Sequence, residues 1–400
     1  MTALVLVINA GSSSLKYSLI DGESGHTHGS GVAERIADSS GGDGILTHTG
    51  ADGEKHRSEL PLPSHEAALR AALDAFETHG PALDPAELAA VGHRVVHGGE
   101  RFSQPALVDD DLVAAIEDLV VLAPLHNPGN LEGLEVARRL FATVPQVAVF
   151  DTAFHQTLPE RAYTYAVPRQ WREELGVRRY GFHGTSHRFV AGEVARLLGR
   201  QLESVNTIVL HLGNGASAAA VAGGRSVDTS MGMTPLEGLV MGTRSGDVDP
   251  SLHAHLQRQR GWSLEQIDSE LNHDSGLRGL IGFGDFRELD RLRHEGDPRA
   301  ELALDVYCYR LRKYVGAYYA ALGTVDAIAF TGGVGEHSPV VRERTLEGLD
   351  RLGISVDPEL NRADRTGPRQ VSPPGGEVAV LVVPTNEEWQ IAREALEIVR

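Results

Sequence analysis

Apolar and polar positions near the start of the chain predict two strands joined by a short polar turn. The apolar run Leu4–Ile8 predicts a buried strand, and Leu15, Tyr17 and Leu19 alternate with polar residues as in a second strand. The turn between them, Gly11–Ser14, offers backbone N–H groups and hydroxyls with little steric cover, which suits a phosphate group. An ordinary serine-rich hairpin explains this turn equally well.

The same pattern of an apolar strand followed by a small-residue loop occurs twice more. Residues 207–211 continue into Leu212–Ser217, and residues 327–330 continue into Thr331–Glu336. Three such loops suggest three contacts to one nucleotide, and the spacing of the first two indicates an internal duplication. None of the three fits a Walker loop or the Gly-x-Gly-x-x-Gly turn of dinucleotide-binding folds.

Strand and helix patterns alternate along most of the chain, which predicts an α/β fold with buried sheets. Helices with clear start signals are expected at residues 65–79, 298–322 and 339–352. Residues 45–47 and 56–59 are expected to pair as a hairpin, and 366–377 to form a loop before a strand at 378–383.

Composition narrows the possible functions. The 400 residues, 41% of them hydrophobic, can bury a substantial core, and we expect two domains. No apolar run approaches membrane-spanning length and no basic leader precedes the first strand, so we expect a cytoplasmic protein. The lone Cys308 is expected in a helical core. A net charge of −18 argues against nucleic acid and acidic membranes as partners, and with only three lysines, arginine must supply most cations at any anion site.

Polar residues gather directly after apolar strands. Asp151 follows the strand 146–150, His211 follows 205–210, and Pro384–Glu388 follow 378–383. Ligands of open α/β sheets bind outside the carboxyl ends of the strands. This pattern therefore predicts that these residues contribute to a binding site.

Two arginines suggest anion binding. Arg94 lies in an apolar strand that ends at Gly98, where a buried cation needs an anionic partner. Arg244 lies in the glycine-flanked segment Met241–Pro250. An internal ion pair for Arg94 and a local Arg–Asp pair for Arg244 are the alternatives. Together the two guanidinium groups could bind a carboxylate and a transferring phosphoryl group.

Histidines and carboxylates suggest two kinds of metal site. His183 and His187 have the spacing of a zinc pair, but the glycine after His183 indicates a helix start, which disfavours zinc. His126 lies between two prolines, as an anion contact or as a satisfied loop histidine. Asp151 and Glu387 suit a hard cation such as Mg²⁺, with a cap or turn role as the alternative.

Several segments together resemble the acetate kinase (acetokinase) family. They are residues 9–16, 92–99, 123–128, 149–154, 179–187, 211–215, 229–250 and 385–388. The resemblance extends from residue 4 to the C-terminus. It implies the fold of acetate and sugar kinases, heat-shock chaperones and actin, which is α/β with two duplicated ribonuclease H-like domains and an ATP cleft between them, in a homodimer. The expected domains are residues 1–150 plus 388–400, and a nucleotide-binding domain at 151–387.

The resemblance also implies roles for individual residues. Asp151 resembles the catalytic aspartate, Arg94 the carboxylate-binding arginine, and His183 and Arg244 the residues that stabilise the transition state, with His126 as a further phosphoryl contact. Asn9 and Glu387 resemble the pair linked to Mg²⁺, for which Mn²⁺ could substitute. The expected pocket for the acetate methyl group comprises Val96, Leu125, Phe182 and Pro235. The expected nucleotide contacts are Lys16, His211, Leu212, Gly213, Asn214, Gly215, Asp285, Phe286, Arg287, Gly333, Val334, Gly335, Glu336 and His337.

Two departures from the family pattern concern the nucleotide contacts. His337 stands where the family usually has asparagine, so the hydrogen bond expected there changes. Residues 279–285 form a segment about one residue shorter than usual and without its serines.

The implied reaction is a direct in-line transfer of a phosphoryl group from ATP to acetate, which gives acetyl phosphate and is reversible. Acetate is already ionised, so the reaction needs positioning and charge neutralisation and no general base. A propionate or butyrate kinase would differ only in the methyl pocket. An actin- or chaperone-like ATPase, a nucleotide-gated regulator and a zinc hydrolase are the alternatives from other classes.

Overall fold

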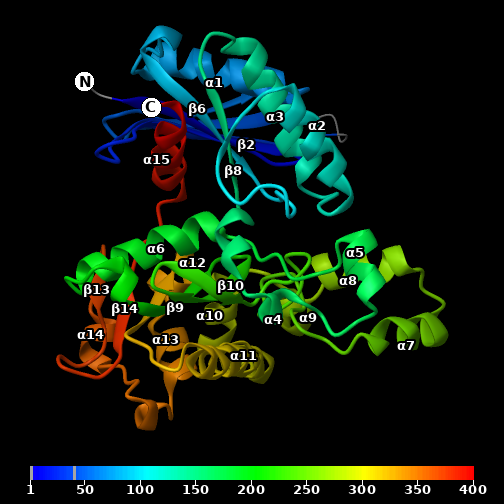
Figure 1. The fold of residues 1–400 in the computed structure, drawn as a ribbon, viewed down its shortest axis with the longest axis vertical. Coiled ribbons are helices and arrows are strands. Elements are labelled where there is room, and N and C mark those ends of the chain that lie inside the picture. Colours follow the sequence, from blue (N-terminus) through cyan, green and yellow to red (C-terminus); the bar gives the residue numbers. More distant parts are fainter. Residues whose placement is uncertain (1–2, 39–41) are drawn as a thin grey trace. The chain divides into compact units, whose positions relative to one another are not determined.

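The structure, a computed structural model, describes residues 3–38 and 42–400 and divides the chain into two compact units (Figure 1). The first unit comprises Met1–Phe154 and Asn386–Arg400, and the second comprises His155–Thr385. The first unit thus includes Asp151 and Glu387, which the boundaries expected from the sequence assign to the second. No helix in the described part of the chain is both long and apolar enough to cross a membrane.

The first unit contains a mixed sheet in the order β5-β4-β3-β2-β1-β6-β8-β7. Strands β1, β2 and β3 are antiparallel neighbours, and β6 and β8 continue the sheet parallel to β1. The bounds are β1 Leu4–Ala10, β2 Ser14–Asp21, β3 Thr27–Glu34, β4 Gly44–Thr49, β5 Lys55–Leu60, β6 Leu88–Val95, β7 Ala106–Leu107 and β8 Gln146–Phe150. In the β4–β5 pair, Ile45 lies opposite Glu59, which confirms the predicted hairpin.

The second unit repeats this core in the order β11-β10-β9-β12-β14-β13. As in the first unit, three antiparallel strands are followed by two parallel ones and a short antiparallel edge strand. The bounds are β9 Asn206–Leu212, β10 Ala216–Ala222, β11 Arg225–Thr229, β12 Ala327–Thr331, β13 Arg369–Gln370 and β14 Ala379–Val382. The predicted duplication within an α/β fold is therefore confirmed.

Side-chain alternation along β1 explains how helices cover both faces of the first sheet. Leu6 and Ile8 belong to the core formed with α1 (His65–His79) and α3 (Asn127–Leu140). Val5 and Val7 belong to the core on the other face, formed with α15 (Glu387–Val399). Successive residues of a strand point to opposite faces, so one apolar run serves both layers. Figure 1 shows α15 on one side of this sheet and α1 and α3 on the other. Helix α2 spans Asp110–Asp118.

Helices of the second unit follow the predicted start signals more closely than the predicted ends. Their bounds are α4 Glu160–Tyr163, α5 Arg169–Leu175, α6 Gly184–Leu197, α7 Ser251–Arg260, α8 Leu264–His273, α9 Gly276–Ile281, α10 Phe286–His294, α11 Pro298–Leu322, α12 Gly332–His337, α13 Pro339–Leu346 and α14 Pro358–Arg362. The predictions for 65–79 and 298–322 are confirmed, and Cys308 lies buried in α11. The prediction for 339–352 was too long, because the backbone leaves the helical conformation at Glu347, with a ψ of 129°, and Gly348 has a φ of 78°.

Two predicted loops contain regular structure. The expected small-residue loop Thr331–Glu336 lies almost entirely in α12, which begins directly after β12 at Gly332. Gly332 has a φ of 75°, and a Cβ there would lie 2.8 Å from the carbonyl oxygen of Leu212. Glycine therefore allows a strand to turn directly into a helix at this point. The predicted loop 366–377 includes β13.

Candidate active site

In the first unit, Arg94 and Asp151 form a two-pronged ion pair at the carboxyl ends of neighbouring strands. Arg94 Nε lies 3.1 Å from Asp151 Oδ1, and Nη2 lies 2.6 Å from Oδ2. The Asp151 side chain is 1% exposed and that of Arg94 20%. Parallel pairing of β6 and β8, with Val95 beside Phe150, brings the two residues together. The internal ion pair, an alternative for Arg94 in the sequence, is therefore present.

Asn9 and Glu387 extend this cluster with oxygen ligands. Arg94 Nη1 donates to Asn9 Oδ1 at 3.4 Å. Burial raises the pKa of Glu387 to about 7, although the Arg94 guanidinium favours its charged form. Burial alone would lower the pKa of Arg94, but Asp151 and Glu387 outweigh it and raise that pKa.

The oxygen atoms of this cluster fit a hard cation. Glu387 Oε1 is buried and has no hydrogen-bond partner, so a cation or its water would satisfy it. Within residues 3–38 and 42–400, no three His, Cys, Asp or Glu side chains are grouped as in an all-protein metal site. A cation held by Asn9 and Glu387 would therefore take its remaining ligands from water or substrate.

The first turn of α3 forms hydrogen bonds to the chain at the ends of β1 and β6. Asn130 accepts a hydrogen bond from the Val96 N–H at 2.9 Å and donates to the Ala10 carbonyl at 2.6 Å. A Cβ on Gly129 would lie 2.8 Å from the carbonyl of Gly11, so only glycine permits this approach. Sequence reasoning missed Gly129 and Asn130, because their partners lie far away in the chain. His126, directly before α3, is half-buried, and Leu125 is 54% exposed.

In the second unit, His183, His187 and His211 form a connected cluster. His183 adopts a left-handed conformation with a φ of 56° directly before α6. The Oγ atom of Ser217 lies 2.9 Å from His183 Nδ1 and 2.7 Å from His187 Nε2. The rings of His183 and His211 stack with their centroids 4.4 Å apart. The two histidines that have the spacing of a zinc pair in the sequence thus contact the same serine hydroxyl.

Arg244 approaches the same cluster without an anionic partner. Its Nη1 contacts the Pro235 carbonyl at 3.3 Å and Met241 Sδ at 3.8 Å, and no carboxylate pairs with it among the described residues. Asp247, expected as one alternative partner, instead accepts from the Gly238 N–H and the Tyr314 hydroxyl. Burial lowers the pKa of Arg244. The alternative of a local Arg–Asp pair was therefore wrong.

Gly215 shows that His183 and Arg244 converge. A Cβ built on this glycine would lie 3.6 Å from Arg244 Nη1 and 3.7 Å from His183 Nε2. Both nitrogen atoms thus border the same short stretch of backbone. A guanidinium and an imidazole at one point can donate hydrogen bonds to a phosphoryl group.

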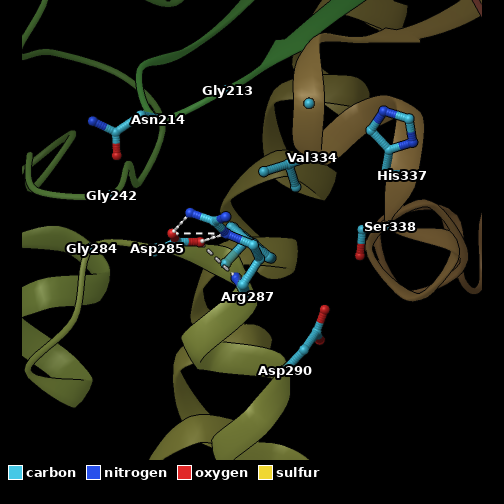
Figure 2. Close-up of a pocket in the computed structure, with 12 residues that line it drawn as sticks. Gly213, Asn214, Gly242, Gly284, Asp285, Arg287, Asp290, Val334, His337 and Ser338 are labelled. Carbon is cyan, nitrogen blue, oxygen red and sulfur yellow. Dashed lines mark hydrogen bonds and ion pairs between the residues drawn. The ribbon is translucent and has the colours of Figure 1, made fainter. Parts of the chain in front are cut away.

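A cavity of about 540 Å³ in the second unit brings together most of the predicted nucleotide contacts. The predicted residues that line it are Gly213, Asn214, Asp285, Phe286, Arg287, Gly333, Val334 and His337. Figure 2 shows Asn214 and Gly242 on one side, His337 and Ser338 on the other, and Arg287 paired with Asp285 between them. The predicted residues His211, Leu212, Gly215, Gly335 and Glu336 are not part of its lining, and Lys16 belongs to the first unit.

Sequence reasoning missed four residues of this cavity: Gly242, Gly284, Asp290 and Ser338. A Cβ on Gly242 would lie 2.0 Å from Asn214 Oδ1 and 2.5 Å from the Gly284 carbonyl. The two glycines thus allow two loops to approach closely, and only their small size signals this in the sequence.

The four residues expected around the acetate methyl group are divided between the two units. Val96 and Leu125 belong to the first unit, and Phe182 and Pro235 belong to the second. Val96 and Phe182 are buried, whereas Pro235 is half-buried. The pocket therefore stays a prediction.

Comparison with known proteins identifies relatives along the whole chain. The sequence model of the acetokinase family matches residues 4–393. The acetate kinase of Leifsonia xyli subsp. xyli is 56% identical over 395 residues, which cover 99% of this chain and 98% of the relative. That of Streptomyces coelicolor is 55% identical over 396 residues, which cover 99% and 97%.

Solved structures match equally broadly. The crystal structure of Porphyromonas gingivalis acetate kinase has a TM-score of 0.94 at 42% identity and covers 100% of both chains. The crystal structure of a propionate kinase from Francisella tularensis has a TM-score of 0.92 at 39% identity and covers 99% of this chain and 100% of that one. These matches confirm the fold that the sequence resemblance implies.

Proposed function

The chain belongs to the acetokinase family, and we propose that it is an acetate kinase. The reaction transfers the γ-phosphoryl group of ATP to acetate and forms acetyl phosphate and ADP. Because acetyl phosphate is itself a phosphoryl donor, the reaction is reversible.

The observation that carries this proposal is the partly buried guanidinium of Arg244, which has no carboxylate partner in the described chain. A desolvated cation without an anion is costly, so the site is arranged for an anion that arrives with a ligand. Its neighbour at Gly215 is His183, a second hydrogen-bond donor. A phosphoryl group in transfer is the anion that suits both groups.

The chemistry requires charge neutralisation above all. The acetate oxygen attacks the γ-phosphorus in line without losing a proton, because the acid is already ionised at neutral pH. Arg244 and His183 donate hydrogen bonds to the equatorial oxygens as their charge redistributes. The Asp151 carboxylate holds the guanidinium group of Arg94 in place, and this group attracts the acetate carboxylate. His126 adds a phosphoryl contact.

Asn9 and Glu387 would hold Mg²⁺, or Mn²⁺ in its place, and the ion would neutralise phosphate charge when bound. The orphaned Oε1 of Glu387 supports this assignment. Lys16, which lies opposite Asn9 in the β1–β2 register, adds positive charge near the same cluster.

The proposed substrates rest on family membership, and the proposed dimer rests also on the surface of α11. We propose a homodimer in the cytoplasm that binds acetate and ATP or ADP, and neither nucleic acid nor membranes. Leu302, Val306 and Tyr309 expose apolar surface at helical spacing on α11, which suits contact with a second copy. Size-exclusion chromatography with light scattering tests the assembly.

Propionate is the second candidate substrate, because the Francisella tularensis relative is described as a propionate kinase. One methylene group in an apolar pocket changes discrimination by about 1–3 kcal/mol. The choice of acid therefore depends on small differences around Val96 and Leu125.

The test is hydroxamate formation from ATP with acetate, propionate and butyrate in parallel. Acetate should give the highest kcat/KM, and a chelator should abolish turnover until Mg²⁺ or Mn²⁺ is added. A higher kcat/KM with propionate would establish the second candidate. No hydroxamate with any of the three acids would overturn both.

A further inference from the structure

A buried hydrogen-bonded chain leads from His187 through Ser217 to His183. Ser217 Oγ lies 2.7 Å from His187 Nε2 and 2.9 Å from His183 Nδ1. Ser217, on β10, and His187, on α6, are both fully buried. The serine has a single hydroxyl hydrogen, so it can donate to only one of the two rings.

The other nitrogen of His187 determines the direction of this chain. His187 Nδ1 is buried and has no hydrogen-bond partner. A buried N–H without an acceptor is rarer and costlier than an unused acceptor, so the ring hydrogen belongs on Nε2. Burial, together with His155 and His211, also lowers the pKa of His187 well below its ordinary value, which keeps the ring neutral. His187 therefore donates from Nε2 to Ser217.

The serine hydroxyl then has its own hydrogen left for the second ring. We propose that His187 and Ser217 are positioning residues that hold neutral His183 in the tautomer with its hydrogen on Nε2. This nitrogen is the one that borders Gly215 and Arg244 Nη1. The inference rests on the proposed function in one respect, namely that the transferring phosphoryl group binds there. An Nε2–H could then donate to a phosphoryl oxygen at once, without a tautomer change.

The surroundings of His183 favour a fixed ring. Its left-handed backbone and its stacking on His211 restrict both the main chain and the imidazole. The charged or titratable groups near it include the His211 and His187 rings and the Arg244 guanidinium, and the His155 ring lies against that of His187.

A second serine–histidine pair beside this cluster provides a matched control. His155 Nε2 donates to the Phe182 carbonyl at 3.0 Å, so its Nδ1 accepts from the hydroxyl of Ser226 at 2.7 Å. Ser226 is as buried as Ser217. The two serines thus have similar surroundings, but the bond of Ser226 ends at His155, not at His183.

The experiment compares Ser217→Ala with Ser226→Ala in the full-length enzyme. Loss of the outer partner of a functional histidine lowers activity by about 10- to 100-fold at metal sites, and we expect Ser217→Ala to lower kcat by a similar factor. The KM values for acetate and ATP should change little, since substrate binding keeps its contacts. Ser217→Thr, which retains the hydroxyl, should restore kcat, and Ser226→Ala should keep it near wild type.

The tautomer itself is measured by nitrogen NMR of histidine-labelled enzyme, with the His183 signal assigned from a His183→Gln sample. Wild type should show hydrogen on Nε2 and none on Nδ1, and His187→Phe should give a tautomer mixture. Wild type with its hydrogen on Nδ1, or equal kcat losses in the two serine variants, would overturn the inference. Because the spectrum needs no turnover, it decides the inference even where Ser217→Ala does not fold or the enzyme makes no acetyl phosphate.

Discussion

Arg94 in the first unit and Arg244 in the second have opposite electrostatic surroundings. Arg94 forms two hydrogen bonds with the buried carboxylate of Asp151 and is close enough to Glu387 for that charge to raise its pKa. Arg244 contacts a carbonyl oxygen and a sulfur atom, and the described chain provides it with no carboxylate. The first cation is compensated by carboxylates within the protein, whereas the second would receive its anion from a ligand under the proposed function.

This difference shows that the two copies of a duplicated fold can carry side chains of different chemistry. The second sheet repeats the order of six of the eight strands of the first, and each unit gathers polar side chains beside its sheet. In the first unit these groups are mainly carboxylates and an amide, which suit a cation and a fixed arginine. In the second they are histidines, an arginine and glycine-rich backbone, which suit phosphate oxygens. The fold fixes where the site residues lie, and the residue types decide which charge each unit binds.

The largest expected effect concerns Arg244, the uncompensated cation. Arginines that stabilise a transferring phosphoryl group contribute about 10³- to 10⁵-fold in rate, so Arg244→Leu should lower kcat by that order. Neither KM should change comparably. Arg244→Lys should restore only part of the rate, because a point charge cannot reproduce the planar fork. Steady-state kinetics with both substrates measure this.

Thermal unfolding provides the control for that prediction, since removing an unpaired cation should not destabilise the fold. A Leu variant that keeps kcat near wild type but unfolds at a lower temperature would show that Arg244 only shapes its loop.

Arg94 should behave differently, because its loss leaves Asp151 buried and unpaired. Breaking a buried ion pair on one side costs about 3–5 kcal/mol, so Arg94→Ala should lower the free energy of unfolding by that amount. It should also raise the KM for acetate and leave the KM for ATP unchanged. Urea unfolding and kinetics measure the two effects.

The exposed pair Arg57–Glu59 offers a matched control, with side chains 59% and 62% exposed. Arg57→Ala should change stability little, as is usual for surface pairs. An unchanged KM for acetate in Arg94→Ala would leave Arg94 with a structural role only.

Glu387 should make stability and cation binding depend on pH. Its pKa is raised in the fold to about 7, so the folded protein binds a proton that the unfolded chain has released. The free energy of unfolding should therefore fall as pH rises from the ordinary glutamate pKa to about 7, and then level off. Mg²⁺ requires the ionised form, so its affinity should rise about tenfold per pH unit below that value.

Glu387→Gln isolates this contribution from those of other titrating groups. Melting temperatures of wild type and variant are measured against pH, with and without Mg²⁺. The variant should lack the part of the pH dependence, and of the response to Mg²⁺, that Glu387 causes in wild type. A wild-type Mg²⁺ affinity that is constant across this range would contradict the assignment of Glu387.

The smallest expected effect concerns Arg287 at the nucleotide cavity. Its ion pair with Asp285 is largely exposed, so Arg287→Ala should leave the melting temperature unchanged. It should raise the KM for ATP severalfold and leave kcat and the KM for acetate unaffected, because the proposed function gives Arg287 a nucleotide contact and no other role. A changed kcat would mean that Arg287 takes part in the transfer itself.

Local patterns in the sequence predicted the elements well, and contacts between distant residues less well. The hairpin at 45–59 and the helix 65–79 depend on neighbouring residues and were found. The need of Arg94 for an anion was also predicted, but its partner lies 57 residues away and becomes adjacent only when β6 pairs with β8. Gly332 was predicted to lie in a loop, but a helix begins there. The reason is its close approach to the backbone of Leu212, which is distant in the sequence.

The path of the chain determines the order in which the two units can be completed during synthesis. Helix α15 closes one face of the first sheet through residues such as Ile391 and Leu396, and it begins with Glu387. A ribosome makes this helix only after it has made the entire second unit. A nascent chain therefore exposes the apolar face that α15 later covers, and lacks the Glu387 carboxylate, until translation reaches residue 387 and beyond. Premature termination late in the message would leave an unfinished first unit attached to a complete second unit.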